Sequence, residues 1–371
     1  MKVVITGDFV PQERVAKMFA QGDYSAVEAL RPVFANADYS IVNLECPILH
    51  GGEKPIIKNG PNLRADTHAL KALKMIGVDC VTLANNHFRD YGDEGVLNTL
   101  AELSAYGIDY VGGGANLKDA AAVLYKQIGK ETLAIINCCE HESSIATDEH
   151  CGGNPLNPIQ QYYAIQEAKS KTDYVLVIVH GGAEHYQLPT SRMQETYQFF
   201  IDAGADAVVN HHQHCYSGYE EYKGKPIFYG LGNLCFDNPN KKGLWNEGYM
   251  VELMFEKKGP RYALIPCHQC DSEPKVVLYN EEEKQEFDKC IAELNGIIAN
   301  PEQLAANYEE LKRSTRMKYR ASIEPYKSRI IRFLFRKHLL PSLMRRKYTI
   351  ISNMIACESH RERLLDALND Q

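Results

Sequence analysis

The residues best suited to chemistry stand in the run GADAVVNHHQH, residues 204–214, where an apolar segment ends in three histidines. An apolar run that ends in clustered imidazoles is typical of a buried strand whose carboxyl end carries a site. His212 and His214 are two residues apart. On an extended backbone both rings would point to one side and could share one metal centre. For this run taken alone, a polar turn with hydrogen-bonded histidines is the alternative.

The elements that would position such residues alternate over residues 1 to about 270, and this alternation of short β-branched runs with helical patterns predicts an α/β fold. Expected helices cover residues 67–75, 94–105 and 193–203. The expected strands cover residues 2–6, 39–44, 80–84, 110–111, 133–137, 174–179, 207–210, 226–229 and 249–255.

Other expected strands end in residues of similar chemistry, and sites form at the carboxyl ends of strands in such sheets. The residues at these ends are Asp8, Glu45, Asn86 with His87, and His180. Each has a simpler interpretation alone: a turn at Asp8, a loop around Asn86, a core histidine at His180. Together, carboxylate, amide and imidazole ligands describe a divalent metal centre of zinc, manganese or iron. A second ion, bridged by one carboxylate, would let the site clamp a phosphoryl group and activate water.

Several motifs occur in family order over residues 1 to about 255. They are GDF (7–9), ADYSIVNLE (37–45), VDCVTLANNHFRDYGDEG (78–95), YGIDYVGGGAN (106–116), HGGAEHY (180–186), GADAVVNHHQH (204–214) and IFYGLGNLCF (227–236). With these motifs the chain resembles the CapA family of bacterial capsule and poly-γ-glutamate synthesis, whose domain is similar to calcineurin-like metallophosphoesterases. The resemblance implies a four-layer α/β/β/α sandwich of two mixed sheets, assigned to residues 1–270.

The resemblance also implies roles for these residues. The implied metal ligands are Asp8, Glu45 as the bridging carboxylate, Asn86, His180, His212 and His214. His87 is implied as the proton donor to a leaving group, and an imidazole that binds no metal suits general acid chemistry near neutral pH. Val10 stands where the broader phosphoesterase pattern has histidine, and Glu45 where it has aspartate, so one ion or two remain open.

Four further residues are weaker candidates. Glu184, four residues after His180, would orient a ligand imidazole as an outer carboxylate. His211 would donate to a carbonyl behind the metal shell, and Asn233 would either line the site or make a turn. Lys58 lies in a polar loop, where it would meet an anionic substrate or simply be solvated.

Residues 271–371 are expected to form a mostly helical, basic extension. Lysine and arginine dominate residues 312–347, where Glu324 is the only acid, and residues 328–340 predict a helix with a broad apolar arc. Such a helix would pack on the main domain or on a second subunit, lie on an anionic membrane surface, or hold an acidic polymer.

The composition narrows the function classes. A net charge of −7 argues against a nucleic-acid binder. No signal-like segment and no run of membrane-spanning length is visible, so we expect a cytoplasmic protein, with peripheral contact at the inner face of the membrane as an option. The cysteines are odd in number and scattered, which favours reduced thiols, and Cys267 and Cys270 have the spacing of half a zinc site by coincidence.

The expected function is that of a metal-dependent hydrolase. A phosphoesterase acting on a phosphorylated polymer, or on its precursor, in capsular polysaccharide or poly-γ-glutamate assembly is the first hypothesis. The alternatives are a non-catalytic subunit that binds a nascent acidic polymer or a synthase, and a metal-dependent hydrolase of γ-glutamyl amides.

Overall fold

The computed structural model describes residues 1–369, which divide into two compact units after Leu304. The sequence places the change of character near residue 270, but residues 271–304 belong to the first unit. They do so because Phe287 and Ile291 are buried with the side chains between the sheets.

The first sheet has eight strands in the order β16-β15-β14-β1-β2-β3-β4, with β13 also pairing with β1. Strands β1 to β4 are parallel, whereas β14, β15 and β16 add antiparallel neighbours. Their bounds are β1 (Lys2–Val10), β2 (Tyr39–Leu44), β3 (Cys80–Thr82), β4 (Asp109–Val111), β13 (Asn233–Phe236), β14 (Glu247–Met254), β15 (Arg261–Gln269) and β16 (Val276–Leu278).

The second sheet has six strands in the order β11-β12-β10-β9-β7-β6, and its four central strands are parallel. Strands β5 (Gly113–Gly114) and β8 (Gly152–Gly153) form a separate short pair. The bounds of the six strands are β6 (Leu124–Ile128), β7 (Glu131–Cys139), β9 (Tyr174–His180), β10 (Ala207–His211), β11 (Tyr219–Tyr222) and β12 (Lys225–Phe228).

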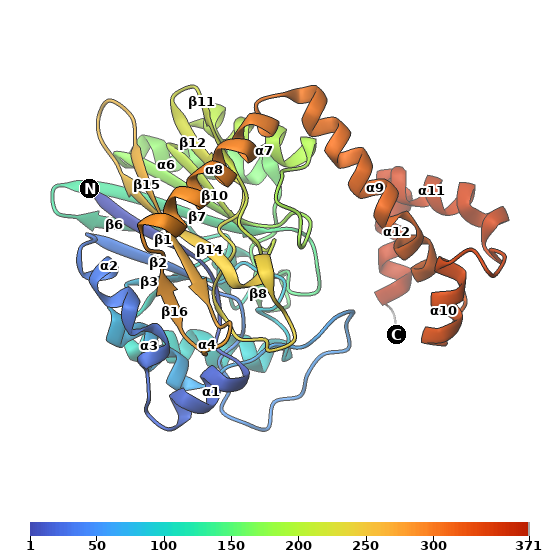
Figure 1. Ribbon diagram of the computed structural model, residues 1–371, viewed down its shortest axis with the longest axis horizontal. Coiled ribbons are helices and arrows are strands. Elements are labelled where there is room, and N and C mark those ends of the chain that lie inside the picture. Colours follow the sequence, from blue (N-terminus) through green and yellow to red (C-terminus); the bar gives the residue numbers. More distant parts are fainter. Residues whose placement is uncertain (370–371) are drawn as a thin grey trace. The chain divides into compact units, whose positions relative to one another are not determined.

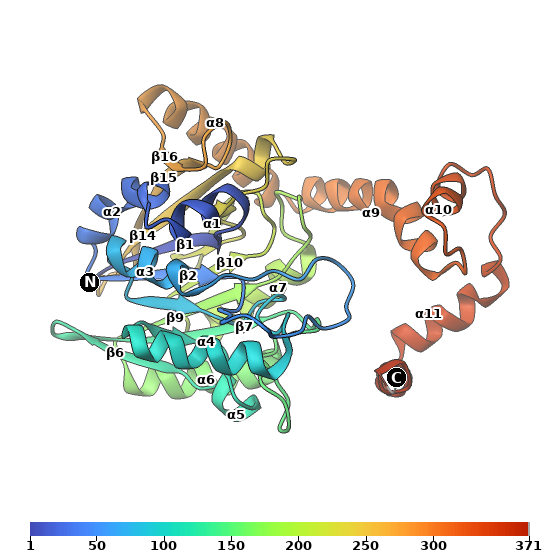
Figure 2. The ribbon, with the colours of Figure 1, turned by 90° about the horizontal axis from the view of Figure 1, so that it is seen from below.

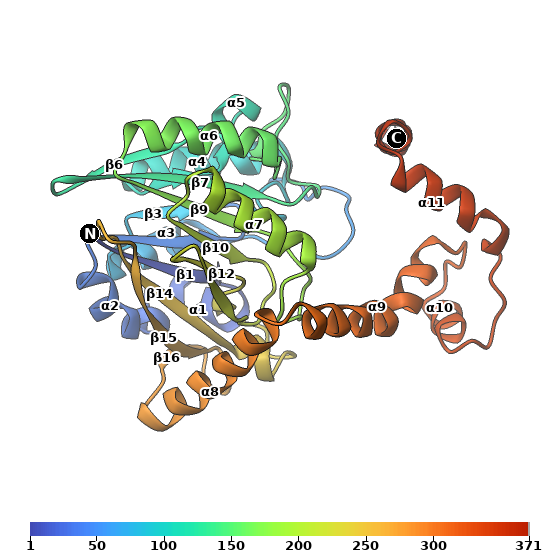
Figure 3. The same ribbon diagram turned by 90° about the horizontal axis from the view of Figure 1, so that it is seen from above.

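The two sheets pack face to face, with helices on both outer faces (Figures 1, 2 and 3). Side chains alternate along each strand, so Val3 and Ile5 of β1 lie between the sheets while Val4 faces helices. The first unit's helices are α1 (Glu13–Ala20), η1 (Ser25–Leu30), α2 (Arg31–Ala35), α3 (Thr67–Ile76), α4 (Gly92–Tyr106), α5 (Leu117–Ala120), α6 (Pro158–Lys171), α7 (Ser191–Ala203), η2 (Gly243–Asn246) and α8 (Glu281–Ile298). The predicted four-layer α/β/β/α sandwich is thereby confirmed.

Capping residues explain where the helices before the site-bearing strands begin and end. Helix α3 begins after Asp66, whose side chain accepts a hydrogen bond from the amide of His68, and ends at Gly77 in the left-handed region. Helix α7 begins after Thr190, which accepts from the amide of Met193. It is followed by Gly204, which has a φ of 123°. Glycine thus follows each of these two helices before the chain turns into the next strand.

Strand β1 differs from its prediction over residues 2–6 because it continues to Val10. Beyond Ile5 its pairing partner changes from β14 to β13, with Asp8 opposite Asn233. A side chain at Gly7 would place its Cβ 2.0 Å from the carbonyl oxygen of Gly232. Glycine at position 7 thus permits the close approach that brings β13 beside Asp8.

Helix α9 (Pro301–Ile323) contains the boundary between the units, and three helices and a 3₁₀ turn follow it. Their bounds are α10 (Arg329–Arg336), η3 (Arg345–Lys347), α11 (Tyr348–Ala356) and α12 (Glu358–Asn369). The predicted helix over 328–340 is shorter in the structure, because the backbone leaves helical geometry near His338, which has a φ of 60°. Among residues 1–369, no helix has both the length and the apolar character needed to cross a bilayer.

All eleven cysteines carry free thiols, and nine of them are buried. Several lie in strands as small apolar side chains, such as Cys80, Cys138 and Cys235. The Sγ atom of Cys270 lies 3.8 Å from that of Cys235. These buried thiols contribute to the hydrophobic core as small apolar side chains.

Candidate metal centre

Polar side chains from both sheets converge at the carboxyl ends of the parallel strands. Strand β1 carries Asp8, Glu45 follows β2, and His180 ends β9. Asn86 and His87 lie in the loop after β3, and His212 and His214 follow β10. All of these side chains are buried, which is unusual for so many polar groups unless they have partners.

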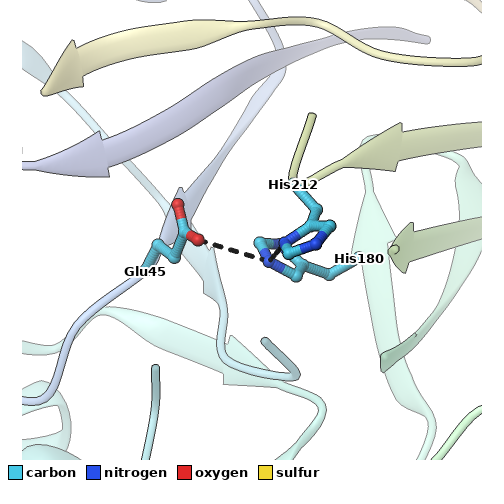
Figure 4. A group of neighbouring side chains, drawn as sticks. All are labelled: Glu45, His180 and His212. Atoms are coloured by element: carbon cyan, nitrogen blue, oxygen red, sulfur yellow. Dashed lines mark hydrogen bonds and ion pairs between the residues drawn. The ribbon is translucent and has the colours of Figure 1, made fainter. Parts of the chain in front are cut away.

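The first ligand group contains Glu45, His180 and His212, which point toward one another in Figure 4. One ligand atom from each lies within 4.8 Å of the others. The Nε2 atom of His180 lies 3.3 Å from Oε1 of Glu45 and 3.1 Å from Nδ1 of His212. The amide oxygen of Asn86 lies 3.0 Å from the same Nε2. Four such donors around one point suit a divalent cation.

The second ligand group contains Asp8, His214 and again Glu45, all within the same 4.8 Å limit. The Nδ1 atom of His214 lies 3.4 Å from Oδ2 of Asp8, and its Nε2 lies 3.9 Å from Oε1 of Glu45. Glu45 is therefore the carboxylate that both groups share. This sharing is the geometry expected of a bridging ligand between two metal positions.

His212 and His214 do not lie on an extended backbone, contrary to the sequence-based expectation. Strand β10 ends at His211, and the two later histidines have φ values of 93° and 53°, in the left-handed region. The amide of His212 lies 3.4 Å from Oδ2 of Asp8, which it faces as a donor. Because of this turn the two rings enter different ligand groups. Such backbone strain in non-glycine residues is concentrated at functional sites.

Burial has opposite consequences for the carboxylates and the imidazoles. It raises the pKa of Glu45 well above its usual value, and the charge of Asp8 adds to this effect. Within residues 1–369, neither oxygen of Glu45 accepts a hydrogen bond. Burial raises the pKa of Asp8 too, but the interactions with His214, His211 and Asn43 together outweigh it and leave that pKa lowered. A buried carboxylate with no hydrogen-bond donor is stabilised by a cation.

Burial favours the neutral, metal-binding form of His180 and His212. Burial lowers the pKa of His180 well below its usual value, and the nearby ring of His212 lowers it further. Burial also lowers the pKa of His212. Neutral imidazoles are the ligands that divalent cations require.

His87 lies beside the ligand groups and is held by a buried carboxylate. Its Nδ1 lies 2.7 Å from Oδ2 of Asp90 and 3.1 Å from Nζ of Lys58, and Lys58 forms an ion pair with Asp90. The amide of Leu63 donates a hydrogen bond of 2.6 Å to the same Asp90 oxygen. Burial lowers the pKa of His87, while Asp90 acts in the opposite direction. Lys58 is thus buried against this pair and is not a solvated loop residue.

The remaining predicted residues lie around the ligand groups. Nε2 of His211 lies 2.8 Å from the carbonyl oxygen of Thr6, behind Asp8. The amide oxygen of Asn233 lies 3.0 Å from Nδ1 of His214. Glu184 is exposed in the loop after β9, where its charge acts on Glu45 and His212. Nδ1 of His180 faces Asn43.

Asn43 and Asp90 are site residues that the sequence analysis did not single out. Asn43 donates 2.7 Å to Oδ1 of Asp8, lies 3.3 Å from Nδ1 of His180, and accepts from Thr82. A signal for Asn43 was present, because it is polar within a wholly buried strand and lies two residues before Glu45. The signal for Asp90 was its place three residues after His87.

Residues 2–238 match the family described as bacterial capsule synthesis protein PGA_cap. The chain belongs to this family. The resemblance drawn from the motifs is confirmed, and the buried ligand groups lie within the matched residues.

The curated relatives fit this assignment. The capsule biosynthesis protein CapA of Bacillus anthracis is 35% identical over 201 residues, which cover 52% of this chain and 49% of that protein. The PGA biosynthesis protein CapA of Bacillus subtilis is 32% identical over 220 residues, covering 58% and 57%. A probable polyglutamine synthesis accessory protein of Mycobacterium tuberculosis is 30% identical over 195 residues, covering 49% and 51%. The chain spans about half the length of the curated relatives it matches.

Solved structures with similar folds were also found. A hypothetical protein from Thermus thermophilus aligns with a TM-score of 0.48 and 18% identity, over 76% of this chain and 100% of that one. A phosphatase from Mycoplasma pneumoniae aligns with a TM-score of 0.43 and 16% identity, over 73% and 95%.

Proposed function

We propose that this protein is a metal-dependent hydrolase, a phosphoesterase that acts on a phosphorylated polymer or precursor in capsular polysaccharide or poly-γ-glutamate assembly. One observation carries the proposal: two buried ligand groups share Glu45, whose oxygens accept no hydrogen bond within residues 1–369. The names of the Bacillus relatives, a capsule and a PGA biosynthesis protein, supply the pathway.

The residues of the site would have separate roles in binding the metal ions and in positioning their ligands. Glu45, His180, His212 and Asn86 would hold one ion, and Asp8, Glu45 and His214 a second. Divalent ions, when bound there, supply Lewis acidity toward a phosphoryl oxygen and lower the pKa of water. Asn43 fixes Asp8 and His180 in position through its two short contacts.

His87 is the group suited to move a proton. Asp90 holds Nδ1, which leaves Nε2 to deliver its proton to the oxygen that departs when the phosphoester bond breaks. Lys58 pairs with Asp90 and lies 3.1 Å from the same Nδ1, so it stands on the side of the ring away from Nε2 and helps to hold Asp90 against His87.

The first test compares metal content and turnover in Glu45→Gln and in the wild type. We expect Glu45→Gln to lose bound metal, measured by elemental analysis, and at least about 100-fold of turnover on a panel of phosphomonoesters, phosphodiesters and lipid-linked sugar phosphates after manganese or zinc loading. His68→Gln, which changes a histidine at the start of α3 outside the site, is the matched control. Wild-type protein that binds metal but turns over none of these substrates would contradict the proposal and favour a non-catalytic accessory role.

A second candidate uses the same site on a different bond. The relatives of B. subtilis and M. tuberculosis carry names of PGA biosynthesis and polyglutamine synthesis, which makes a γ-glutamyl amide the alternative substrate. Two results together would select this candidate over the first. Wild-type protein would release glutamate from poly-γ-glutamate, an activity that Glu45→Gln lacks, and it would not hydrolyse the phosphate esters.

A further inference from the structure

Residues 325–347 of the second unit present only positive charge to solvent. Glu324, just before them, is the only acid in residues 312–347, and its side chain is buried. Its carboxylate accepts hydrogen bonds from the amide of Leu343 at 2.9 Å and the hydroxyl of Tyr348 at 2.8 Å. Eight basic side chains are exposed in this segment: Lys327, Arg329, Arg332, Arg336, Lys337, Arg345, Arg346 and Lys347. Within residues 1–369, none of the eight forms an ion pair.

Large apolar side chains are exposed among these cations. Ile330 is 71% exposed, Phe333 50%, Leu339 68% and Leu343 61%. Only Phe335 of α10 is buried, where its ring packs against Tyr326 with the centroids 5.6 Å apart. The unit therefore covers just a small part of the apolar surface that α10 offers.

The two kinds of side chain are segregated around α10. At 100° per residue, Arg329, Arg332 and Arg336 fall within an arc of about 60°, and the apolar residues occupy most of the remainder. Nζ of Lys337 lies 5.8 Å from the ring centroid of Phe333, so a cation stands beside an exposed aromatic side chain. This is the composition of a helix that lies in a lipid interface, with apolar side chains inserted and cations at the head groups.

We propose that residues 325–347 form a docking surface for an anionic bilayer, which we call the basic apolar surface. Charge complementarity selects an anionic partner, because eight cations lack a carboxylate to balance them. The exposed apolar side chains select lipid over a soluble acidic polymer, since a polyanion provides no apolar phase to receive Phe333 and Ile330. The proposed contact is peripheral, because it is made by side chains on the surface of the second unit. It is independent of the proposed hydrolase activity.

The test measures sedimentation of the full chain with vesicles of phosphatidylcholine alone and of equimolar phosphatidylcholine and phosphatidylglycerol. We expect binding to the anionic vesicles only, and weakening of that binding as salt rises. The double variant Arg332→Gln/Arg336→Gln should bind about 25-fold more weakly, at about fivefold for each cation. Ile330→Gln/Phe333→Gln should bind at least about tenfold more weakly.

Matched controls change exposed residues of the first unit. Lys118→Gln/Lys130→Gln removes two exposed cations, and Ile159→Gln removes an apolar side chain that is 70% exposed, so both should bind like the wild type. Absence of binding to anionic vesicles would overturn the proposal, and so would equal binding to neutral ones. Tight binding to soluble poly-γ-glutamate that the arginine pair weakens and Ile330→Gln/Phe333→Gln leaves intact would assign the surface to a polyanion instead. A dimer that dissociates in Ile330→Gln/Phe333→Gln would assign it to a second copy.

Discussion

Glu45 is the residue on which the candidate centre depends, because both ligand groups take an oxygen from it. Its neighbours divide into ligands and residues that position ligands. Asn43 connects Asp8 to His180, and Asp90 connects His87 to Lys58. The second kind acts through hydrogen bonds, and its contribution shows in turnover when metal binding is intact.

Asp90→Asn tests this division. Replacing Asp90 should reduce kcat about 10- to 100-fold while the metal content stays unchanged, because the change affects the ring of His87 and no proposed ligand. The measurement pairs steady-state kinetics with elemental analysis.

Asp93→Asn is the matched control, since Asp93 lies three residues after Asp90 and pairs with Arg89 on the partly exposed side of the same segment. It should leave kcat unchanged. If Asp90→Asn instead loses metal, Asp90 supports the ligand groups and not the proton donor.

At the residue scale, the sequence allowed the types of ligand to be predicted, but it did not show which ligands belong to the same group. Asp8, Glu45, His180 and the histidines after β10 stand out as polar residues at the ends of apolar runs. That His212 and His214 belong to different groups follows from their left-handed backbone, which a spacing of two residues does not reveal. Asn43 matters through its contacts with Asp8 and His180, and Asp90 also pairs with Lys58. These partners are distant in the chain, so the contacts leave no periodic pattern in the sequence.

At the scale of elements, the site depends on how closely β13 approaches β1. Gly7 and Gly232 meet where β1 changes its pairing partner, and the register places Asn233 opposite Asp8. Asn233 in turn reaches Nδ1 of His214. The α/β alternation was predictable from hydrophobic patterns and the four layers from the family resemblance, whereas this switch of strand partners depends on two glycines far apart in sequence.

Gly7→Ala should therefore lower the free energy of unfolding by about 3 kcal/mol, because its Cβ would meet the backbone of Gly232, which cannot move aside cheaply. Urea denaturation followed by circular dichroism measures the change. Gly296→Ala in α8 is the control: no atom lies within 4 Å of the added Cβ, and the change should stabilise the protein by about 0.5–1 kcal/mol. Equal stability of Gly7→Ala and wild type would show that the two strands separate without cost.

At the scale of the whole molecule, the chain forms two units with different means of stabilisation. The first buries three apolar clusters around its sheets. The second buries few side chains, among them Phe335 and Glu324. Its fold relies on the hydrogen bonds that Glu324 accepts from Ser342, Leu343 and Tyr348.

The second unit should accordingly be sensitive to acid. Burial raises the pKa of Glu324, but the hydrogen bonds that its carboxylate accepts outweigh this and leave the pKa below its ordinary value of 4.5. A lowered pKa contributes stability that is present above pH 4.5 and is lost as the pH falls through the lower, folded value. Hydrogen exchange of amides in α10 and α11 should therefore quicken in that range.

Glu324→Gln should show the same quickening at neutral pH, corresponding to about 1–2 kcal/mol. Glu362→Gln, an exposed acid on α12, is the control and should exchange like the wild type. If the exchange rates of Glu324→Gln match the wild type at neutral pH, the carboxylate does not hold this unit together.

The buried thiols determine how quickly the protein is inactivated by oxidation. Nine of its cysteines are shielded from solvent, while Cys290 and Cys357 are partly exposed. Burial raises the pKa of Cys138 and Cys139, so these thiols stay protonated and inert toward oxidants while the sheets remain packed. Each transient opening of the sandwich exposes a nucleophile that can be oxidised irreversibly. Irreversible oxidation of these cysteines therefore accumulates with each unfolding event. The rate at which the layers separate then determines how long the protein stays folded and active under oxidising conditions.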